Sequence, residues 1–207
     1  MTVLYIASGA CSLAAHSLVH ELGLPIQIEP VALRTPPTRR STPSTRWAGC
    51  RRCNWTTAAC SPKNSALLPY LADLRPEAGL FAPAGSVERA RIQSWIGYLT
   101  SEVHVGGFRP LNRPERYSAD EGAHPGIRAQ ASEQLHQALA HIERHLNGRQ
   151  WLVGERYTIA DAYLGVFAGW LPRLGEPFAD LVQIARIGAA FRARPAVRKA
   201  LATEGLL

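Results

Sequence analysis

The sequence of 207 residues lacks any long apolar run, and none approaches the roughly 20 residues that a helix needs to cross a bilayer. It also lacks a basic N-terminal region followed by an apolar stretch, which argues against a secretory signal. There is no internal repeat and no low-complexity tract. These absences favour a globular chain in the cytoplasm, large enough for one sizeable domain or two small ones, with no membrane partner.

Cysteine is scarce and unevenly placed. Of the four cysteines, Cys50, Cys53 and Cys60 fall within one segment, and only Cys11 lies outside it. So few cysteines in a chain of this length do not make the disulfide framework of a small secreted protein.

Acidic residues are absent between Arg34 and Lys63, where seven basic residues stand. This segment accounts for the whole net charge of +7, and the rest of the chain is neutral. The basicity therefore belongs to one segment, and it does not by itself indicate a nucleic-acid partner.

The chain opens with the pattern of a β-α-β unit. A short apolar run at residues 2–7 predicts a buried strand, and residues 12–23 have apolar side chains at helical spacing before a final glycine. Alternation over residues 25–33 predicts a second strand. Such a unit predicts two parallel strands joined by a right-handed crossover.

The rest of the chain has helical patterns. Asn64 or Ser65 can cap a helix that ends before Pro76, and residues 81–86 have the composition of a linker. Three helical stretches then follow, over residues 86–105, 127–148 and 158–171, and a final pair of helices is predicted over residues 181–201. In the third of these, Thr158 and Asp161 have the spacing of a capping box. We therefore expect an α/β domain over residues 1–80 and an all-helical domain over residues 87–207.

Cys11 is the first candidate for chemistry, because it stands where a predicted strand ends and a helix begins. The unpaired N–H groups and the positive end of the dipole at the start of a helix lower the pKa of a thiol and favour the thiolate. The alternative is a buried cysteine that acts as a small hydrophobe. His16, which follows it in the same helix, is expected to be structural.

The chain resembles the bacterial beta class of glutathione transferases in five blocks. Its opening reads YIASGACSLAAHSLVHELGL, where the family has a strand, then S-P-G-A-C-S-L, then a helix. The later blocks, in the family's order, are PYLADLRPEAGL, LTSEVH with FRPL, WLVGERYTIADAYL and ARPAVRKALATEGL. The resemblance covers about residues 2–35 and 64–207.

This resemblance implies a thioredoxin-like N-terminal domain, an all-helical C-terminal domain, a homodimer, and glutathione as co-substrate without a metal. It implies that glutathione binds through Ala10, Cys11, Asn64, Ser65 and His104, with Cys11 and His104 as catalytic residues. In the family, the cysteine that matches Cys11 lies near the glutathione sulfur and can form a mixed disulfide with it. The histidine that matches His104 lines the same cleft. Without the family, His104 reads as an ordinary histidine at a helix end.

The chain departs from the family in two places. Around His104 it reads EVHVGGF, with one glycine more than the family pattern and Val105 where a lysine is usual. Between the second strand and the third helix, the family carries N-P-x-G-x-V-P-x-L and a hairpin that ends in L-T-E. There a backbone held open by a cis-proline pairs with glutathione, and the glutamate grips its γ-glutamyl end. This chain has no Val-Pro there and has Lys63 in place of the glutamate.

We hypothesise that the missing motif is written in the neighbouring reading frame. When triplets start at the third base of each codon, Trp47 with Ala48 must give Gly, and Trp55 with Thr56 must give Asp. With G or C at most free third positions, residues 44–63 read N-P-L-G-G-V-P-A-L-Q-L-D-D-G-R-V-L-T-E, and Asn64 follows. Sequencing the DNA across codons 35–64 tests this, because a clean read that encodes both tryptophans in frame would exclude a recording error.

The same segment suggests other functions when it is taken as written. Cys50 and Cys53 have the spacing of a redox-active pair or of half a zinc site, but a structural zinc site needs four ligands and only Cys60 stands nearby. Arginine and tryptophan alternate as they do in some nucleic-acid-binding segments, although no such fold surrounds them. Neither zinc nor nucleic acid is therefore expected.

The main functional hypothesis is a glutathione transferase that conjugates the glutathione thiolate to a small hydrophobic electrophile, held mainly by the helical domain. One alternative is a non-catalytic protein of the same fold that binds apolar ligands, because a chain made as written would lose strands three and four and the grip on glutathione. Another alternative is glutathione-dependent thiol–disulfide exchange through Cys11. Cysteine-bearing members of the superfamily also carry out reductive dehalogenation or isomerisation, and these activities remain open as well. The sequence does not identify the electrophile.

Overall fold

The computed structural model describes residues 2–31, 52–54, 60–61, 63–175 and 178–207. By its internal contacts, the chain divides into two units. Met1–Phe81 and Phe191–Leu207 form the first unit, and Ala82–Ala190 forms the second. These contacts group the last segment with the first unit, whereas the sequence pattern assigned residues 87–207 to one helical domain.

The first unit contains a small mixed sheet. Its strands are β1 (Val3–Ile6), β2 (Gln27–Pro30), β3 (Arg52–Asn54) and β4 (Cys60–Ser61), in the spatial order β2-β1-β3-β4. Strand β1 pairs with β2 in parallel and with β3 antiparallel, and β3 pairs antiparallel with β4. The predicted β-α-β unit is confirmed. The expectation that the chain as written loses strands three and four is wrong, because two short strands form there.

Much of the basic segment between Arg34 and Lys63 lies outside the described residues. Cys50, Trp47 and Trp55, on which the zinc and reading-frame hypotheses depend, are among the residues left out. The loop between β2 and β3, where the family has its cis-proline, lies outside them as well. The hypotheses about the reading frame, zinc and nucleic acid therefore stay sequence-based.

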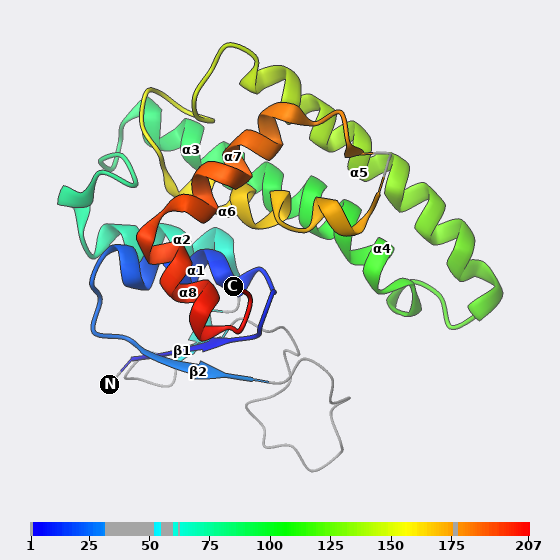
Figure 1. The fold of residues 1–207 in the computed structure, drawn as a ribbon, viewed down its shortest axis with the longest axis horizontal. Helices are drawn as coiled ribbons and strands as arrows, with labels where there is room; N and C mark the ends of the chain where they lie inside the picture. Colours follow the sequence, from blue (N-terminus) through cyan, green and yellow to red (C-terminus); the bar gives the residue numbers. More distant parts are fainter. Residues whose placement is uncertain (1, 32–51, 55–59, 62, 176–177) are drawn as a thin grey trace. The chain divides into compact units, whose positions relative to one another are not determined.

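Three helices complete the first unit: α1 (Ser12–Glu21), α2 (Asn64–Asp73) and α8 (Pro195–Thr203). Helix α1 packs against α2 and α8, and Figure 1 shows α1 (blue) beside α8 (red). The small side chains Ala14 and Ala15 are fully buried in α1 and allow this close approach. Leu4 of β1 and Leu67 of α2 are also fully buried, so a single core joins sheet and helices.

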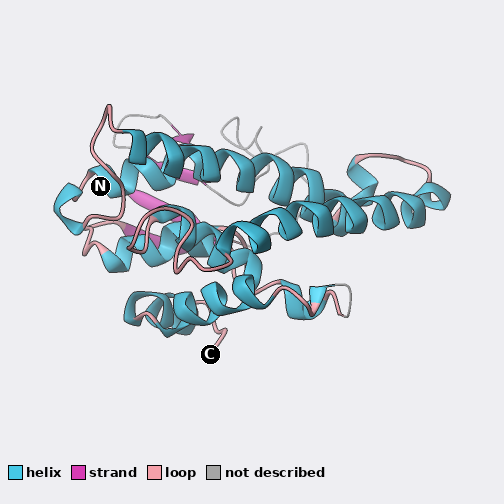
Figure 2. Cartoon of the chain, turned by 90° about the horizontal axis from the view of Figure 1, so that it is seen from above, coloured by secondary structure: helices cyan, strands magenta, loops and turns pink. Residues whose placement is uncertain are grey.

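The second unit is helical. Figure 2, which colours helices cyan, shows that helices make up most of the described chain. The longer elements of the second unit are α3 (Val87–Tyr98), the π-helix η3 (Leu99–Phe108), α4 (Arg109–Asn112), α5 (His124–Leu146) and α6 (Ile159–Ala168), and α7 (Val182–Ala193) runs from it into the first unit. Short 3-10 turns at Pro114–Arg116, Glu121–Ala123 and Leu171–Arg173 connect them. No helix within the described ranges is long and apolar enough to span a membrane.

Helix α6 is the central element of this unit, since every one of its residues is buried. Thr158 is its N-cap, and its hydroxyl accepts a hydrogen bond from Ala160 N. One carboxylate oxygen of Asp161 accepts from Thr158 N at 2.8 Å, and the other accepts from Leu152 N at 2.9 Å. The predicted capping box is confirmed, and it also fixes the loop before the helix.

Candidate active site

Cys11 lies at the N-cap of α1, where strand β1 has ended, as the sequence pattern predicts. The turn before it is held by Ala10 N, which donates to Ala7 O at 3.0 Å, and by Gly9 with a positive φ of 68°. The hydroxyl of Ser12 accepts from Ala7 N at 3.1 Å. This turn buries the Cys11 side chain to 3% exposure and leaves Ala10 at 9%.

Asn64 contacts the Cys11 turn directly. Its side-chain amide Nδ2 donates to Cys11 O at 2.8 Å, and the residue is fully buried. Its other side-chain atom, Oδ1, has no hydrogen-bond partner among the described residues. The structure therefore brings together two of the predicted glutathione-binding residues from helices α1 and α2.

The expectation that Asn64 or Ser65 caps helix α2 is wrong. Lys63 occupies the N-cap position, and no side chain in the described part of the chain makes a capping hydrogen bond at this end of the helix. Asn64 is the first helical residue, and its amide is engaged by Cys11 O instead. Ser65 follows it as the second helical residue and is half-buried. The start of α2 is thus a helix N-terminus without a side-chain cap, a setting that favours a bound anion.

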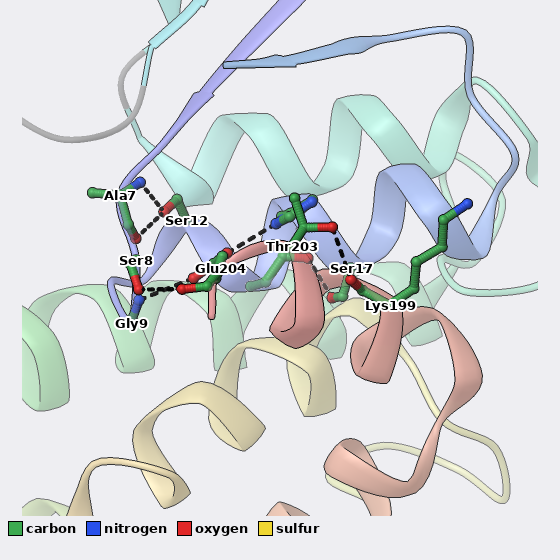
Figure 3. A network of polar contacts seen from close by, with 10 residues as sticks. Ala7, Ser8, Gly9, Ser12, Ser17, Lys199, Thr203 and Glu204 are labelled. Carbon is green, nitrogen blue, oxygen red and sulfur yellow. Dashed lines mark hydrogen bonds and ion pairs between the residues drawn. The ribbon is translucent and has the colours of Figure 1, made fainter. Parts of the chain in front are cut away.

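A buried carboxylate at the other end of the chain anchors the same turn (Figure 3). Glu204 accepts a hydrogen bond from Gly9 N at 2.9 Å through Oε2, and its backbone carbonyl accepts from the Ser8 hydroxyl at 2.7 Å. Its other carboxylate oxygen lies 2.9 Å from Nδ1 of His16. The segment after α8 therefore holds the turn that presents Cys11.

A second histidine stands next to this network. The rings of His16 and His20 are 5.0 Å apart, and Nε2 of His20 is buried without a hydrogen-bond partner among the described residues. Burial, followed by the charges of His16 and Lys199, holds the pKa of His20 below its ordinary value. The protonated form of His20 is thus disfavoured in the folded protein.

His104 belongs to the second unit, apart from the four other predicted site residues, which all lie in the first. It is half-buried in η3, and its Nδ1 lies 3.1 Å from the hydroxyl oxygen of Tyr163 on α6. Its ring centroid is 5.4 Å from that of Phe167 and 5.8 Å from that of Trp170. His104 therefore sits against an aromatic wall with a hydroxyl group in it.

The extra glycine near His104 falls within the π-helix η3. A π-helical turn holds more residues than an α-helical one, so an inserted residue can be accommodated without turning the elements on either side out of phase. Gly107 is needed for this path, because a Cβ atom there would lie 2.7 Å from Cδ1 of Leu135. The extra glycine therefore coincides with a π-helical stretch in place of an ordinary α-helix.

Sequence reasoning missed two residues that contact the predicted site residues. Tyr163 stands in the TIADAYL block, but its spacing from His104 gives no local signal. Glu204 reaches the Cys11 turn from the C-terminal end of the chain, and no pattern near either residue indicates that contact. Among the described residues, no group of three or more histidine, cysteine or acidic side chains is placed to hold a metal ion.

Comparisons with known proteins agree with this geometry. The family model for the C-terminal domain of glutathione S-transferases matches residues 125–202. The chain is 30% identical over 206 residues to glutathione S-transferase GST-4.5 of Xanthomonas campestris pv. campestris, with 98% of each chain covered.

Solved structures give the same answer for the fold. A sphingomonad glutathione S-transferase complexed with glutathione has a TM-score of 0.85 and 30% identity, and the match covers 99% of this chain and 100% of that one. A bacterial beta-class enzyme from Sphingomonas chungbukensis has a TM-score of 0.85 and 27% identity over the same shares. A thioredoxin-like domain followed by a helical one, as the sequence predicted, is the fold of these proteins. The chain therefore belongs to the glutathione S-transferase family.

Proposed function

We propose that the protein binds reduced glutathione and transfers its thiolate to a small hydrophobic electrophile. The observation that carries this proposal is the buried hydrogen bond from Asn64 to Cys11 O, which joins the starts of α1 and α2. Each of these starts supplies backbone N–H groups and a positive dipole end, so together they suit a ligand that carries a thiolate and a carboxylate. The sphingomonad relative was solved with glutathione bound.

In this proposal, the residues of the first unit hold the peptide. Ala10 and Cys11 contact the glutathione sulfur at the start of α1, and Asn64 and Ser65 bind the γ-glutamyl end at the start of α2. A sulfur kept as a thiolate is the reacting nucleophile, and the donors around it favour its anionic form. Conjugation then forms a carbon–sulfur bond while the leaving group departs with its electron pair.

The aromatic wall around His104 is the proposed site for the electrophile. Phe108 and Phe167 stack with ring centroids 5.5 Å apart, and Trp170 meets Phe108 edge-on at 5.0 Å. Phe108 and Phe167 are themselves buried, so a flat, apolar substrate would stack on the half-buried Trp170 that packs against them. His104 contributes a polar atom at its edge, where a developing charge can be stabilised.

Titration calorimetry with reduced glutathione tests the binding step, and an activated chloronitrobenzene tests conjugation. We expect saturable binding and release of chloride in step with product. A verified sample of the chain as written that neither binds glutathione nor is retained on a glutathione column would contradict the proposal. It would instead support the non-catalytic ligand-binding alternative, which the lysine at position 63 favours.

The Cys11→Ala variant separates transfer from redox chemistry. If the Cys11 thiol serves redox chemistry and not the activation of glutathione, thiol–disulfide exchange disappears while conjugation persists. If conjugation disappears as well, the Cys11 thiol is needed for transfer itself. The same assay run with a mixed-disulfide substrate distinguishes the exchange alternative.

We also propose that the protein is a homodimer. The residues that repeat along one side of α3 and the start of η3 are exposed and mostly small: Val87, Ala90, Ser94, Gly97 and Ser101. Their spacing of three and four residues places them on one helix face, and small side chains let a second helix approach closely. Light scattering should give twice the chain mass of 22.6 kDa. The Gly97→Arg variant should be monomeric, whereas the Gly126→Arg control on α5 should not change the mass.

A further inference from the structure

The start of helix α2 has an excess of positive charge. Lys63 is exposed at the N-cap, its side chain makes no capping hydrogen bond, and the first turn of the helix contains no acidic residue. The positive end of the helix dipole and the backbone N–H groups of the first turn lie at the same place. All these features favour a bound anion, such as a carboxylate, over a cation.

A buried acceptor lies beside this helix start. Asn64 is fully buried, and its Nδ2 donates to Cys11 O at 2.8 Å, whereas its Oδ1 has no hydrogen-bond partner among the described residues. Because both atoms belong to one planar amide, Oδ1 also lies next to the starts of α1 and α2. A buried acceptor without a donor is costly, so a ligand that supplies an N–H group there is stabilised.

The surrounding unit as a whole is cationic. The first unit, Met1–Phe81 with Phe191–Leu207, contains twelve lysine or arginine residues and five acidic ones, so it carries the whole net charge of +7. A surplus of this size attracts anions and repels cations. The five acidic residues are Glu21, Glu29, Asp73, Glu77 and Glu204.

Two of these carboxylates are already engaged within the unit. Glu204 is buried, and its two oxygens contact Gly9 N and Nδ1 of His16. Glu21 forms an ion pair with Arg194. Neither carboxylate is therefore offered to a cation at the start of α2.

The other three carboxylates stand on other parts of the unit. Glu29 lies on the outer strand β2, where it accepts a hydrogen bond from Gln27 at the exposed surface. Asp73 is the last residue of α2, and nine residues of helix place it about 14 Å from Asn64 along the helix axis. Glu77 lies beyond it in the turn after α2. The start of α2 thus has a lysine but no carboxylate to balance a ligand cation.

A free ammonium group is consequently disfavoured at this site. It would be repelled by Lys63 and by the helix dipole, and it would have to leave water without a counter-ion in order to reach Asn64 Oδ1. A peptide N–H carries no net charge and can donate to the same oxygen without this cost. The start of α2 therefore suits a carboxylate close to a neutral N–H donor.

We propose that this site prefers a thiol peptide whose γ-glutamyl end has a carboxylate but no free ammonium group, and that Lys63 determines the preference. Glutathione whose amino group is absent or acylated belongs to this class. The inference rests on the proposed function, because it concerns the ligand held at the starts of α1 and α2. It separates this chain from the family pattern, which has a glutamate at the position of Lys63.

Titration calorimetry with two peptides tests the preference. The peptides are reduced glutathione and glutaryl-cysteinylglycine, which is glutathione without its amino group, and the DNA used must encode Lys63. We expect the glutaryl peptide to bind about 2- to 10-fold more tightly, the size of effect that one charge has near an exposed helix end. Added salt should reduce the ratio, because Lys63 is exposed. Equal affinities, or tighter binding of glutathione, would overturn the proposal.

Lys63→Glu should reverse the preference, because a carboxylate at the N-cap attracts the ammonium group of glutathione. Lys63→Gln should give a ratio between the two. Arg75→Glu is the matched control, since it changes the net charge by the same amount just beyond the other end of α2, where the Arg75 side chain contacts Leu74 O. It should keep the wild-type ratio. An equal change of the ratio in Lys63→Glu and Arg75→Glu would show that net charge alone sets the preference and would contradict the role of Lys63.

The same titrations separate this inference from the proposed function. A wild type that binds glutathione at least as tightly as the glutaryl peptide, and conjugates it, would refute the preference and leave the transferase function intact. A wild type that binds the glutaryl peptide but not glutathione would support the preference and refute glutathione as the co-substrate. A wild type that binds neither peptide would refute both.

Discussion

His16 and Glu204 meet across 188 positions of sequence, with Nδ1 of the imidazole 2.9 Å from one carboxylate oxygen. Neither side chain is exposed to solvent. Because the other carboxylate oxygen accepts from Gly9 N, the pair connects α1, the turn before Cys11 and the end of α8. The residue that follows α8 thus stabilises the turn before Cys11.

The Glu204→Gln variant should lose stability. One side-chain oxygen remains to accept from a single partner. The new amide nitrogen then faces either the Gly9 N–H, where two donors meet, or Nδ1 of His16, which can accept only if the imidazole proton moves to Nε2, a buried atom with no hydrogen-bond partner among the described residues. A buried donor left without an acceptor costs about 1–3 kcal/mol, so the free energy of unfolding in urea should fall by that amount. Thr203→Ala is the control, because the Thr203 hydroxyl group only donates to Lys199 O on the exposed side of α8. Equal stability of Glu204→Gln and the control would contradict this account.

His20 should make the protein less stable in mild acid. Its pKa is lowered in the folded state, so below about pH 6.5 the unfolded chain takes up a proton that the folded chain resists. Stability should therefore rise with pH up to that value. In His20→Gln, the thermal midpoint should depend less on pH between about 5 and 7.

The control for this experiment is His141→Gln, because His141 is exposed on α5 and has no ion pair with a described residue. Its pH dependence should match that of the wild type. A His20→Gln variant with the same slope as the wild type would show that other groups cause the acid sensitivity.

The sequence predicts local features of this fold well. The β-α-β unit follows from hydrophobic periodicity and from a glycine at the end of the helix, and both are properties of neighbouring residues. The capping box at Thr158 and Asp161 is equally local, because its two partners stand three positions apart. Such features need no knowledge of the tertiary structure.

The parts that the sequence does not predict depend on distant contacts. Asn64 reads as a helix cap, yet its amide contacts Cys11, which lies 53 positions away. Glu204 and Tyr163 give no local sign of their partners. The π-helix η3 lies between these two cases. The extra glycine near His104 marks a departure from the family pattern, but it does not indicate which kind of helix forms.

Gly107 should not tolerate a larger side chain. An added Cβ atom would lie 2.7 Å from Cδ1 and 2.9 Å from Cβ of the fully buried Leu135. Overpacking of this kind costs about 1–3 kcal/mol, so Gly107→Ala should lower the free energy of unfolding by that amount. Gly126→Ala is the control, because a Cβ atom there meets nothing within 4 Å and alanine is the better helix former. A Gly107→Ala variant as stable as this control would mean that η3 does not pack closely on α5.

Asn64→Asp tests the contact that supports the proposed glutathione site. The new carboxyl group has nearly the same shape, but when it is ionised it cannot donate to Cys11 O and is a buried charge facing an oxygen. Urea unfolding at neutral pH should therefore show a loss of about 2–4 kcal/mol.

When the carboxyl group is protonated it regains a donor, and its folded-state pKa must exceed its unfolded value because only the neutral form fits. The loss should consequently shrink as the pH falls toward the unfolded-state value and grow as the pH rises. The exposed Asn112→Asp exchange should show no such trend, and a loss in Asn64→Asp that does not vary with pH would contradict the buried hydrogen bond.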